Sequence, residues 1–511
     1  MNLQEIDNRH RFIVLIHSQK PRIMRLHMII LTSLIILLLN SCKQTKTTYV
    51  SVVFDVEDYI SPVEEGVDDI PKWLAETMTE VGVTGTFFVI GEKARSLEDR
   101  GRQDVIEAMA SHDIGSHTNF GSIHPTVTEL LEFADWVTGV QTMMKNESIG
   151  FEDLERIYKV PAKTLARHGG SYGPQLVYAL GKMGKGYVYS PVHLPKHNAV
   201  WFCNTLNFHG DYAFFDDFYF KDELFNPAFD TLQKNFEKDM EGMDVVSFFG
   251  CHPTKVRGEQ FWDFNFYEGA NPDVSELLPP RLRPAESMVT ARKNFKRLME
   301  YLNNQDYIEI TTYDDLMDRF SFQRDFISRK ELRHIASEII AQNKVLIDDY
   351  FSPAEIFAAL TESLVSAKEG GKLPRKTERS SPIGPMTMPP GNPEISNLTV
   401  DDMYELASQA LSFIKEKSTL PSALEVEGKK IGLGSLLHLF GTAYVDVASG
   451  KHKENYEVRT FDPYPTENEE AIISEVEGFK YWIVHRPDLD MAHLAELTRL
   501  QLWTLKPAHE R

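Results

Sequence analysis

The stretch Ser51-Val52-Val53-Phe54-Asp55-Val56-Glu57-Asp58-Tyr59 decides the fold class predicted for this chain. It begins with β-prone, mainly apolar residues, as is typical of a buried parallel strand. Carboxylates follow at Asp55, Glu57 and Asp58, where an α/β barrel carries its chemistry at the C-terminal ends of its strands. Crowded carboxylates repel one another unless a cation or a shared proton relieves them. The stretch predicts either a cation site or a solvated acidic turn.

Further strands alternate with helical stretches after this one. The pattern predicts helices over 71–81 and 104–111, and strands over 84–91, 113–116, 186–190, 205–209, 244–249 and 307–311. Such alternation is typical of parallel β/α architecture. Because Asp55, His117 and His252 each come at the end of a predicted strand, we expect a distorted (β/α) barrel with one active face.

Composition excludes some classes of function. The chain has 511 residues, of which 75 are acidic and 54 basic, and its net charge is −21. This balance argues against a nucleic-acid partner, which would require a basic face. The three cysteines, Cys42, Cys203 and Cys251, form no Cys-x-x-Cys pair and imply no disulfide framework.

The N-terminus has the pattern of an export signal. A basic start at 24–28 precedes an apolar run over 29–39, which ends at Leu39-Asn40-Ser41-Cys42. The last four residues resemble a bacterial lipoprotein box, so we expect residues 1–41 to be a signal peptide (1–23 superfluous), Cys42 to carry lipid and 42–48 to be a tether. The protein would then be exported and anchored by lipid to a bacterial membrane. The alternative is a plain membrane anchor in which Cys42 is incidental.

Two histidines, His117 and His124, lie in one predicted loop after the carboxylate cluster. Two histidines and one carboxylate with open coordination positions suit zinc or another divalent metal. A metal held in this way can activate water for hydrolysis.

The order of these motifs resembles the polysaccharide deacetylase family, the NodB-homology group of carbohydrate esterases. The resemblance spans roughly 49–321 and rests on Phe54-Asp55-Val56-Glu57-Asp58, Thr84 to Val89, Gly115-Ser116-His117-Thr118 with His124-Pro125, Arg167, and Cys251-His252-Pro253. It implies metal-dependent removal of N-acetyl or related acyl groups from a carbohydrate polymer.

The resemblance also assigns roles to individual residues. Asp55 matches the general base, Arg167 the arginine that orients it, and His252 the general acid. The metal ligands implied are Asp58, His117 and His124, with Glu57 as the reserve ligand, and zinc is the metal expected. Tyr172 matches a backbone oxyanion donor, and Trp262 belongs to an aromatic stretch that suits stacking on sugar rings.

The sequence departs from the family pattern at several points. The first motif is Phe-Asp-Val-Glu-Asp rather than Phe-Asp-Asp-Gly, the histidines are seven residues apart instead of four, and Gly169-Gly170 stands where the arginine motif has proline. The aspartate that tunes the acid histidine has three candidates: Asp211, Asp216 and Asp217. Two alternatives to a deacetylase stay open, namely a non-catalytic glycan-binding module and an allantoinase-like hydrolase of another C–N amide bond.

Helical periodicity dominates after residue 321. A segment starting at Ser352 repeats at Thr399 with an offset of 47, and each copy has an N-cap residue with an acidic residue three positions later. We expect a first repeat unit with a proline-rich linker over 322–395, a second unit over 396–450 and a C-terminal segment of unknown role over 451–511. The second copy, with Leu420-Pro421 and Gly428, resembles pseudomurein-binding repeats. The other interpretation is a helical module without a ligand.

Overall fold

A computed structural model describes residues 47–511. Its core is a parallel sheet around β1 (Thr48–Val56), which is buried along its whole length. β1 pairs in parallel with β2 (Gly85–Val89), β8 (Val245–Cys251) and β9 (Ile308–Ile310). The sheet continues from β2 through β3 (Asp113–Ser116), β4 (Thr164–Ala166), β5 (Gly186–Ser190) and β7 (Thr205–His209). The α/β class predicted from the opening stretch is confirmed.

The sheet curls back on itself. Tyr212, just past β7, forms a parallel bridge with Phe248 of β8, and its backbone N–H and C=O bond to Ser247 and Phe249. This short contact links β7 and β8, which lie at opposite edges of the parallel part of the sheet. The curled sheet is the distorted barrel that the strand pattern predicted. Two antiparallel strands, β6 (Ala199–Phe202) and β16 (Lys506–Pro507), extend the sheet beyond β7 and make it mixed.

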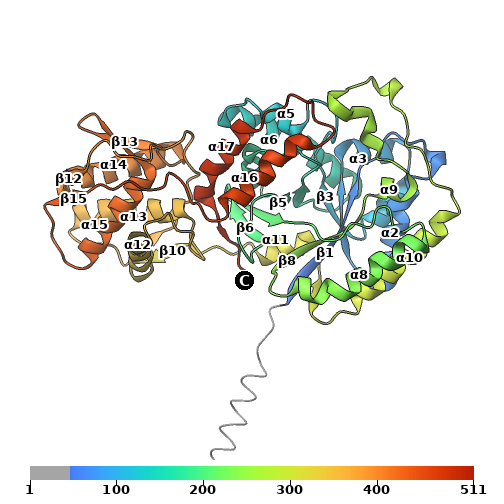
Figure 1. The fold of residues 1–511 in the computed structure, drawn as a ribbon, viewed down its shortest axis with the longest axis horizontal. Coiled ribbons are helices and arrows are strands. Elements are labelled where there is room, and N and C mark those ends of the chain that lie inside the picture. The colour runs from blue at the N-terminus through green and yellow to red at the C-terminus, as the bar shows by residue number, and fades with distance from the viewer. Residues whose placement is uncertain (1–46) are drawn as a thin grey trace, which may run out of the picture. The chain divides into compact units, whose positions relative to one another are not determined.

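Helices cover the outside of the curled sheet (Figure 1). They carry buried apolar faces that pack on Phe54, Phe87 and the other core residues. Their bounds are α2 Asp69–Val81, α3 Gly91–Asp99, α4 Gln103–Met109, α5 Val127–Leu131, α6 Trp136–Tyr158, α7 Pro174–Lys182, α8 Asp222–Met240, α9 Pro253–Arg257, α10 Ser287–Asn303 and α11 Tyr313–Arg319. The helices predicted at 71–81 and 104–111 correspond to α2 and α4. The sequence pattern did not reveal β4, which is only three residues long.

Residues 326–457 form two similar helical units. The first contains β10 (Phe326–Ser328), α12 (Arg329–Gln342), α13 (Pro353–Gly370) and β11 (Lys376–Glu378). The second contains β12 (Asn397–Thr399), α14 (Val400–Lys417), the hairpin β13 (Ala423–Val426) and β14 (Lys429–Gly432), α15 (Leu433–Ala448) and β15 (Asn455–Glu457). In each unit the first and last strands pair antiparallel. Across the units α12 packs on α15 and α13 packs on α14, as in a pseudo-twofold pair.

This arrangement differs from the repeat predicted at an offset of 47. The helices after Ser352 and Thr399 both begin with a capping box, which produced the match. However, α13 is the second helix of its unit, whereas α14 is the first. The structural counterpart of Thr399 is Ser328, which also follows a short strand and forms a capping box. The predicted offset aligned helices that are not equivalent in the fold.

The C-terminal segment returns to the barrel after the helical units. It contains α16 (Glu469–Gly478), α17 (Ala492–Gln501) and β16, which pairs with β6. Val484 packs in one apolar cluster with Ile90, Trp262 and Phe266. The helical units therefore interrupt the barrel body, and the C-terminal segment, to which the sequence assigned no role, packs on it. Within residues 47–511, no helix is both long enough and apolar enough to cross a membrane. Cys42 and the predicted signal peptide lie outside the described residues.

Candidate metal centre and acid–base pair

Glu57, His117 and His168 meet at the C-terminal ends of the strands. Each offers a ligand atom, and these atoms lie within 4.8 Å of one another. Glu57 follows β1, His117 follows β3 and His168 comes two residues after β4. All three side chains are buried. Two imidazoles and one carboxylate are the kind of donor set that the sequence predicted, but of the three ligands expected there (Asp58, His117 and His124) only His117 belongs to this cluster.

Hydrogen bonds fix the tautomer of each histidine. The Nδ1 atom of His117 lies 3.2 Å from the carbonyl oxygen of Ala166, which can only accept, so Nδ1 carries the proton. Its lone pair is then on Nε2, 3.2 Å from Oε1 of Glu57. Burial lowers the pKa of His117 to about 4, so this ring is neutral at neutral pH.

A hydrogen bond to one ring nitrogen also fixes the orientation of His168. Its Nε2 lies 2.9 Å from Oγ of Ser122, and that hydroxyl donates to Asp263 at 3.3 Å. Ser122 therefore accepts from His168, which leaves the lone pair on Nδ1. This Nδ1 lies 3.3 Å from Oε1 of Glu57, is buried and receives no hydrogen bond from any residue in 47–511.

Both imidazole lone pairs and one carboxylate oxygen thus face a common point. Such acceptor atoms repel one another unless a cation lies between them. The other oxygen of Glu57, Oε2, accepts a hydrogen bond of 2.8 Å from the indole N–H of Trp262. Distal N–H groups held by carbonyl or hydroxyl oxygens are typical of metal-binding histidines. The residues present fit a divalent metal ion.

Asp55 and His252 lie beside this cluster. Oδ2 of Asp55 is 3.5 Å from Nε2 of His117 and 3.8 Å from Nε2 of His252. Burial raises the pKa of Asp55 well above its usual range, which the charge of His252 opposes and that of Glu57 reinforces. Tyr189, which sequence reasoning missed, donates its hydroxyl to Oδ1 of Asp55 at 3.3 Å.

His252 is held by Asp216, one of the three aspartates considered from the sequence. Nδ1 of His252 donates to Oδ2 of Asp216 at 2.8 Å, and the backbone N–H of His252 donates to Oδ1 at 2.7 Å. Burial lowers the pKa of His252, but the charge and hydrogen bond of Asp216, together with the charges of Glu57 and Asp55, outweigh it and raise this pKa to about 10. The imidazole is therefore cationic at neutral pH and can donate a proton from Nε2.

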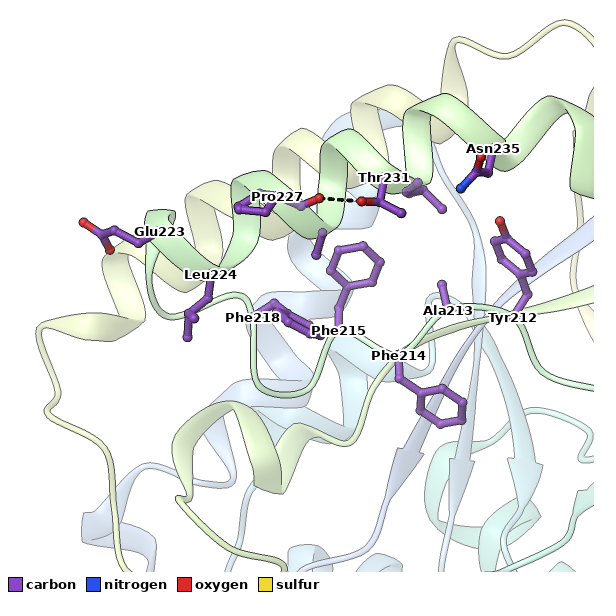
Figure 2. A pocket seen from close by; sticks show the side chains of 12 residues that line it. Tyr212, Ala213, Phe214, Phe215, Phe218, Glu223, Leu224, Pro227, Thr231 and Asn235 are labelled. Carbon is purple, nitrogen blue, oxygen red and sulfur yellow. Dashed lines mark hydrogen bonds between the residues drawn. The ribbon is translucent and has the colours of Figure 1, made fainter.

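Apolar contacts of three phenylalanines position the loop that carries Asp216. Phe215 and Phe218 lie beneath α8, next to Leu224 and Pro227, whereas Phe214 points to the other side of the loop (Figure 2). Phe215 is buried and packs on Tyr219 and Phe248. Phe214 is half exposed and packs on Phe249, which in turn contacts the ring of His252.

Asp58 and His124 lie outside the cluster, in contrast to the sequence prediction. Asp58 accepts hydrogen bonds from Ile60 N, Ser61 N and Ser61 Oγ at 2.7–3.0 Å, and therefore stabilises a turn. His124 contacts Glu129 at 2.7 Å and the carbonyl oxygen of Phe266 at 3.1 Å. Side chains alternate along an extended chain, so Asp55 and Glu57 share one face and Asp58 has the opposite one.

Three further predicted residues have structural contacts instead. Arg167 donates to the carbonyl oxygens of Tyr189 and Gly169 and lies over the ring of Phe479; no ion pair with Asp55 is present among the described residues. The backbone N–H of Tyr172 donates to Thr128 and its hydroxyl meets Thr498, so it offers no oxyanion donor. Trp262 is fully buried, so its ring cannot stack on a sugar in this conformation.

No protein-family model matches the sequence, and no curated protein sequence is similar to it. Solved structures with a similar fold include a putative polysaccharide deacetylase from Mycobacterium smegmatis (16% identity, TM-score 0.33), which aligns over 54% of this chain and 90% of its own. An allantoinase aligns over 53% of this chain and 90% of its own (13%, 0.33). A CE4 family pseudoenzyme from Bacillus anthracis aligns over 54% and 66% (10%, 0.29).

Proposed function

We propose that the chain is a metal-dependent hydrolase that removes N-acetyl or related acyl groups from a carbohydrate polymer. The observation that carries this proposal is the convergence of one ring nitrogen each from His117 and His168 on Oε1 of Glu57, next to the His252–Asp216 pair. Glu57, His117 and His168 would hold the metal. When bound, a divalent ion would lower the pKa of a coordinated water and offset negative charge at the scissile carbonyl.

The remaining residues divide the proton transfers between them. Asp55, buried and hydrogen-bonded to Tyr189, would accept the proton of the attacking water, because the charge of a bound metal would favour its ionised form against the effect of burial. His252, charged through Asp216, is placed to donate its Nε2 proton to the departing amine. The amine that leaves from an amide needs such a proton donor. The alcohol that leaves from an ester depends on one less.

An envelope glycan is the substrate class that we propose. This part rests on the predicted export signal and on Cys42 as a lipid attachment site, which would hold the chain at a bacterial membrane. The net charge of −21 is compatible with a neutral or cationic polymer and disfavours a strongly anionic one.

A substrate panel tests the proposal. Purified zinc-loaded protein is incubated with N-acetylated glucosamine oligomers, peptidoglycan fragments, O-acetylated sugars and small cyclic amides such as allantoin, and released acetate or ring opening is measured. We expect acetate from at least one N-acetylated glycan, and none from Glu57→Gln. Turnover of the cyclic amide alone would instead assign another C–N hydrolase, and glycan binding without any turnover would assign a non-catalytic module.

A further inference from the structure

A second group of metal-ligating side chains lies apart from the centre described above. It consists of His193 in the loop after β5, His209 at the end of β7 and Glu475 on α16. Each offers a ligand atom, and these atoms lie within 4.8 Å of one another. All three residues are partly exposed. Three parts of the chain that are distant in sequence thus meet at this point.

In both imidazoles the free lone pair lies on Nε2. Nδ1 of His209 lies 2.7 Å from the carbonyl oxygen of Ser190, and Nδ1 of His193 lies 3.4 Å from that of Pro191. Because a carbonyl can only accept, each Nδ1 carries the proton and each Nε2 is free to bind a metal. Burial lowers the pKa of both histidines, so both rings are in the neutral form that ligation requires.

Glu475 supplies a carboxylate with no protein partner. Within residues 47–511 its side chain makes no hydrogen bond or salt bridge, and burial raises its pKa. Besides burial, this pKa is influenced by Arg167 and His193, which lower it, and by Asp211, which raises it. Arg167 is already held by two carbonyl oxygens and by the ring of Phe479, so it does not neutralise Glu475 by direct contact.

We propose that His193, His209 and Glu475 form a second site for a divalent transition metal of the zinc class. Two imidazoles and one carboxylate are a donor set that zinc accepts, with a position left for water. His193, His209 and Asp211 also line a cavity of about 380 Å³, which gives an ion a path from solvent.

Ion binding requires one change in the side chains. The rings of His193 and His209 are stacked, with centroids 3.7 Å apart and planes 18° from parallel. A lone pair lies in the plane of its ring, so the two rings must open away from each other to converge on one ion. His193 is the ring that turns, because its 3.4 Å hydrogen bond is weaker than the 2.7 Å bond of His209.

Such a metal would fasten α16 to the ends of β5 and β7. One hydrogen bond already links these parts, since the side-chain amide of Asn468, which precedes α16, donates to the carbonyl oxygen of His193 at 3.0 Å. A ligand that binds only the folded state stabilises it by mass action. We therefore expect zinc at this site to raise the unfolding temperature of the barrel body.

Metal stoichiometry of the full chain tests this site separately from the proposed catalytic one. Zinc is titrated into chelator-treated protein, and bound metal is counted by mass spectrometry after desalting. We expect two equivalents in the wild type, one in His209→Ala, one in Glu475→Gln and one in His117→Ala, with none in the double variant His117→Ala/His209→Ala. His334→Ala, at an exposed histidine on α12, is the matched control and should retain two.

The outcomes separate the two sites. Two equivalents retained by both His209→Ala and Glu475→Gln would overturn the second site, as would one equivalent in the wild type that neither variant removes. A single equivalent that His209→Ala removes and His117→Ala leaves would support it and count against the proposed function. Circular dichroism identifies a variant that fails to fold, and Glu475→Gln, at a partly exposed position, then carries the test. Zinc should raise the unfolding temperature of His117→Ala but not of the double variant.

Discussion

The indole Nε1–H of Trp262 donates a hydrogen bond of 2.8 Å to Oε2 of Glu57. The ring is fully buried, and it is one of the residues that sequence reasoning assigned to sugar binding. Its hydrogen bond instead leaves Oε1 of Glu57 directed towards His117 and His168. Trp262 therefore positions a candidate ligand rather than a substrate.

Trp262→Phe tests this positioning. The change removes the N–H donor and leaves a buried carboxylate oxygen without a partner, so we expect metal affinity to fall by roughly 10–100-fold. Competition with a chromophoric chelator measures the dissociation constant. The control is Phe266→Leu, which changes a ring that packs on Trp262 without contacting Glu57. Equal affinity in Trp262→Phe and wild type would exclude the positioning role.

Glu57→Gln and Asp58→Asn together distinguish the two candidate carboxylate ligands. The structure predicts that Glu57→Gln abolishes binding at the cluster, because a neutral amide replaces the only carboxylate among the three ligands. Asp58→Asn should retain the metal and lose roughly 1–3 kcal/mol of stability, since a hydrogen-bonded turn is weakened. Metal content and urea unfolding are the measurements. The opposite pattern, with metal lost only in Asp58→Asn, would restore the assignment made from the sequence.

Several residues of the candidate site could be placed from sequence because they follow strands. Asp55, His117 and His252 each come directly after or within the end of an apolar run, and parallel strands end on the same side of a sheet. The fold class followed from the same alternation of strands and helices. The order of the elements along the chain was therefore enough to bring these three side chains together.

The remaining ligands depend on geometry that spacing does not contain. Asp58 was favoured over Glu57, although alternation along an extended chain places Glu57 on the same face as Asp55. His168 was visible only as the neighbour of Arg167, because the three-residue strand β4 before it has too little pattern to be recognised. The place of the C-terminal segment in the fold depends on the long-range packing of α16, α17 and β16, which no local signal in the sequence predicts.

The charge of His252 should set the alkaline limit of any activity. Asp216, with smaller contributions from Glu57 and Asp55, raises the pKa of His252 to about 10 against the effect of burial, so the protonated acid is present below that pH and lost above it. Asp216→Asn removes the largest of the charges that raise this pKa, and we expect the alkaline limb of the pH–rate profile to move to lower pH and the rate at pH 8 to fall by roughly 10²-fold.

The matched control for this variant is Asp217→Asn. Asp217 is the next residue but pairs with Arg283 and Lys255 instead of His252. Nuclear magnetic resonance titration of the His252 ring gives a readout that does not need a substrate. A ring whose pKa is the same in Asp216→Asn as in wild type would show that Asp216 does not charge it.

Glu147 on α6 should make folding stability depend on pH. It is buried, and Oε2 accepts a hydrogen bond of 3.0 Å from the backbone N–H of Asn119, in the loop after His117. Burial raises its pKa from 4.5 to about 7. The folded state thus holds a proton that the unfolded state releases, so stability declines as pH rises from about 4.5 to about 7 and the loss is complete above that.

Glu147→Gln keeps an oxygen for Asn119 and removes the titration. We expect the variant to be more stable than wild type at pH 8 by up to about 3 kcal/mol and to show little difference at pH 4.5. Urea unfolding at both pH values measures the change, with the exposed Glu152→Gln on the same helix as control. Because Asn119 fixes the loop that begins at His117, a stability gain without loss of metal binding would also show that this carboxylate is dispensable for the centre. An equal stability difference at the two pH values would mean that Glu147 titrates normally.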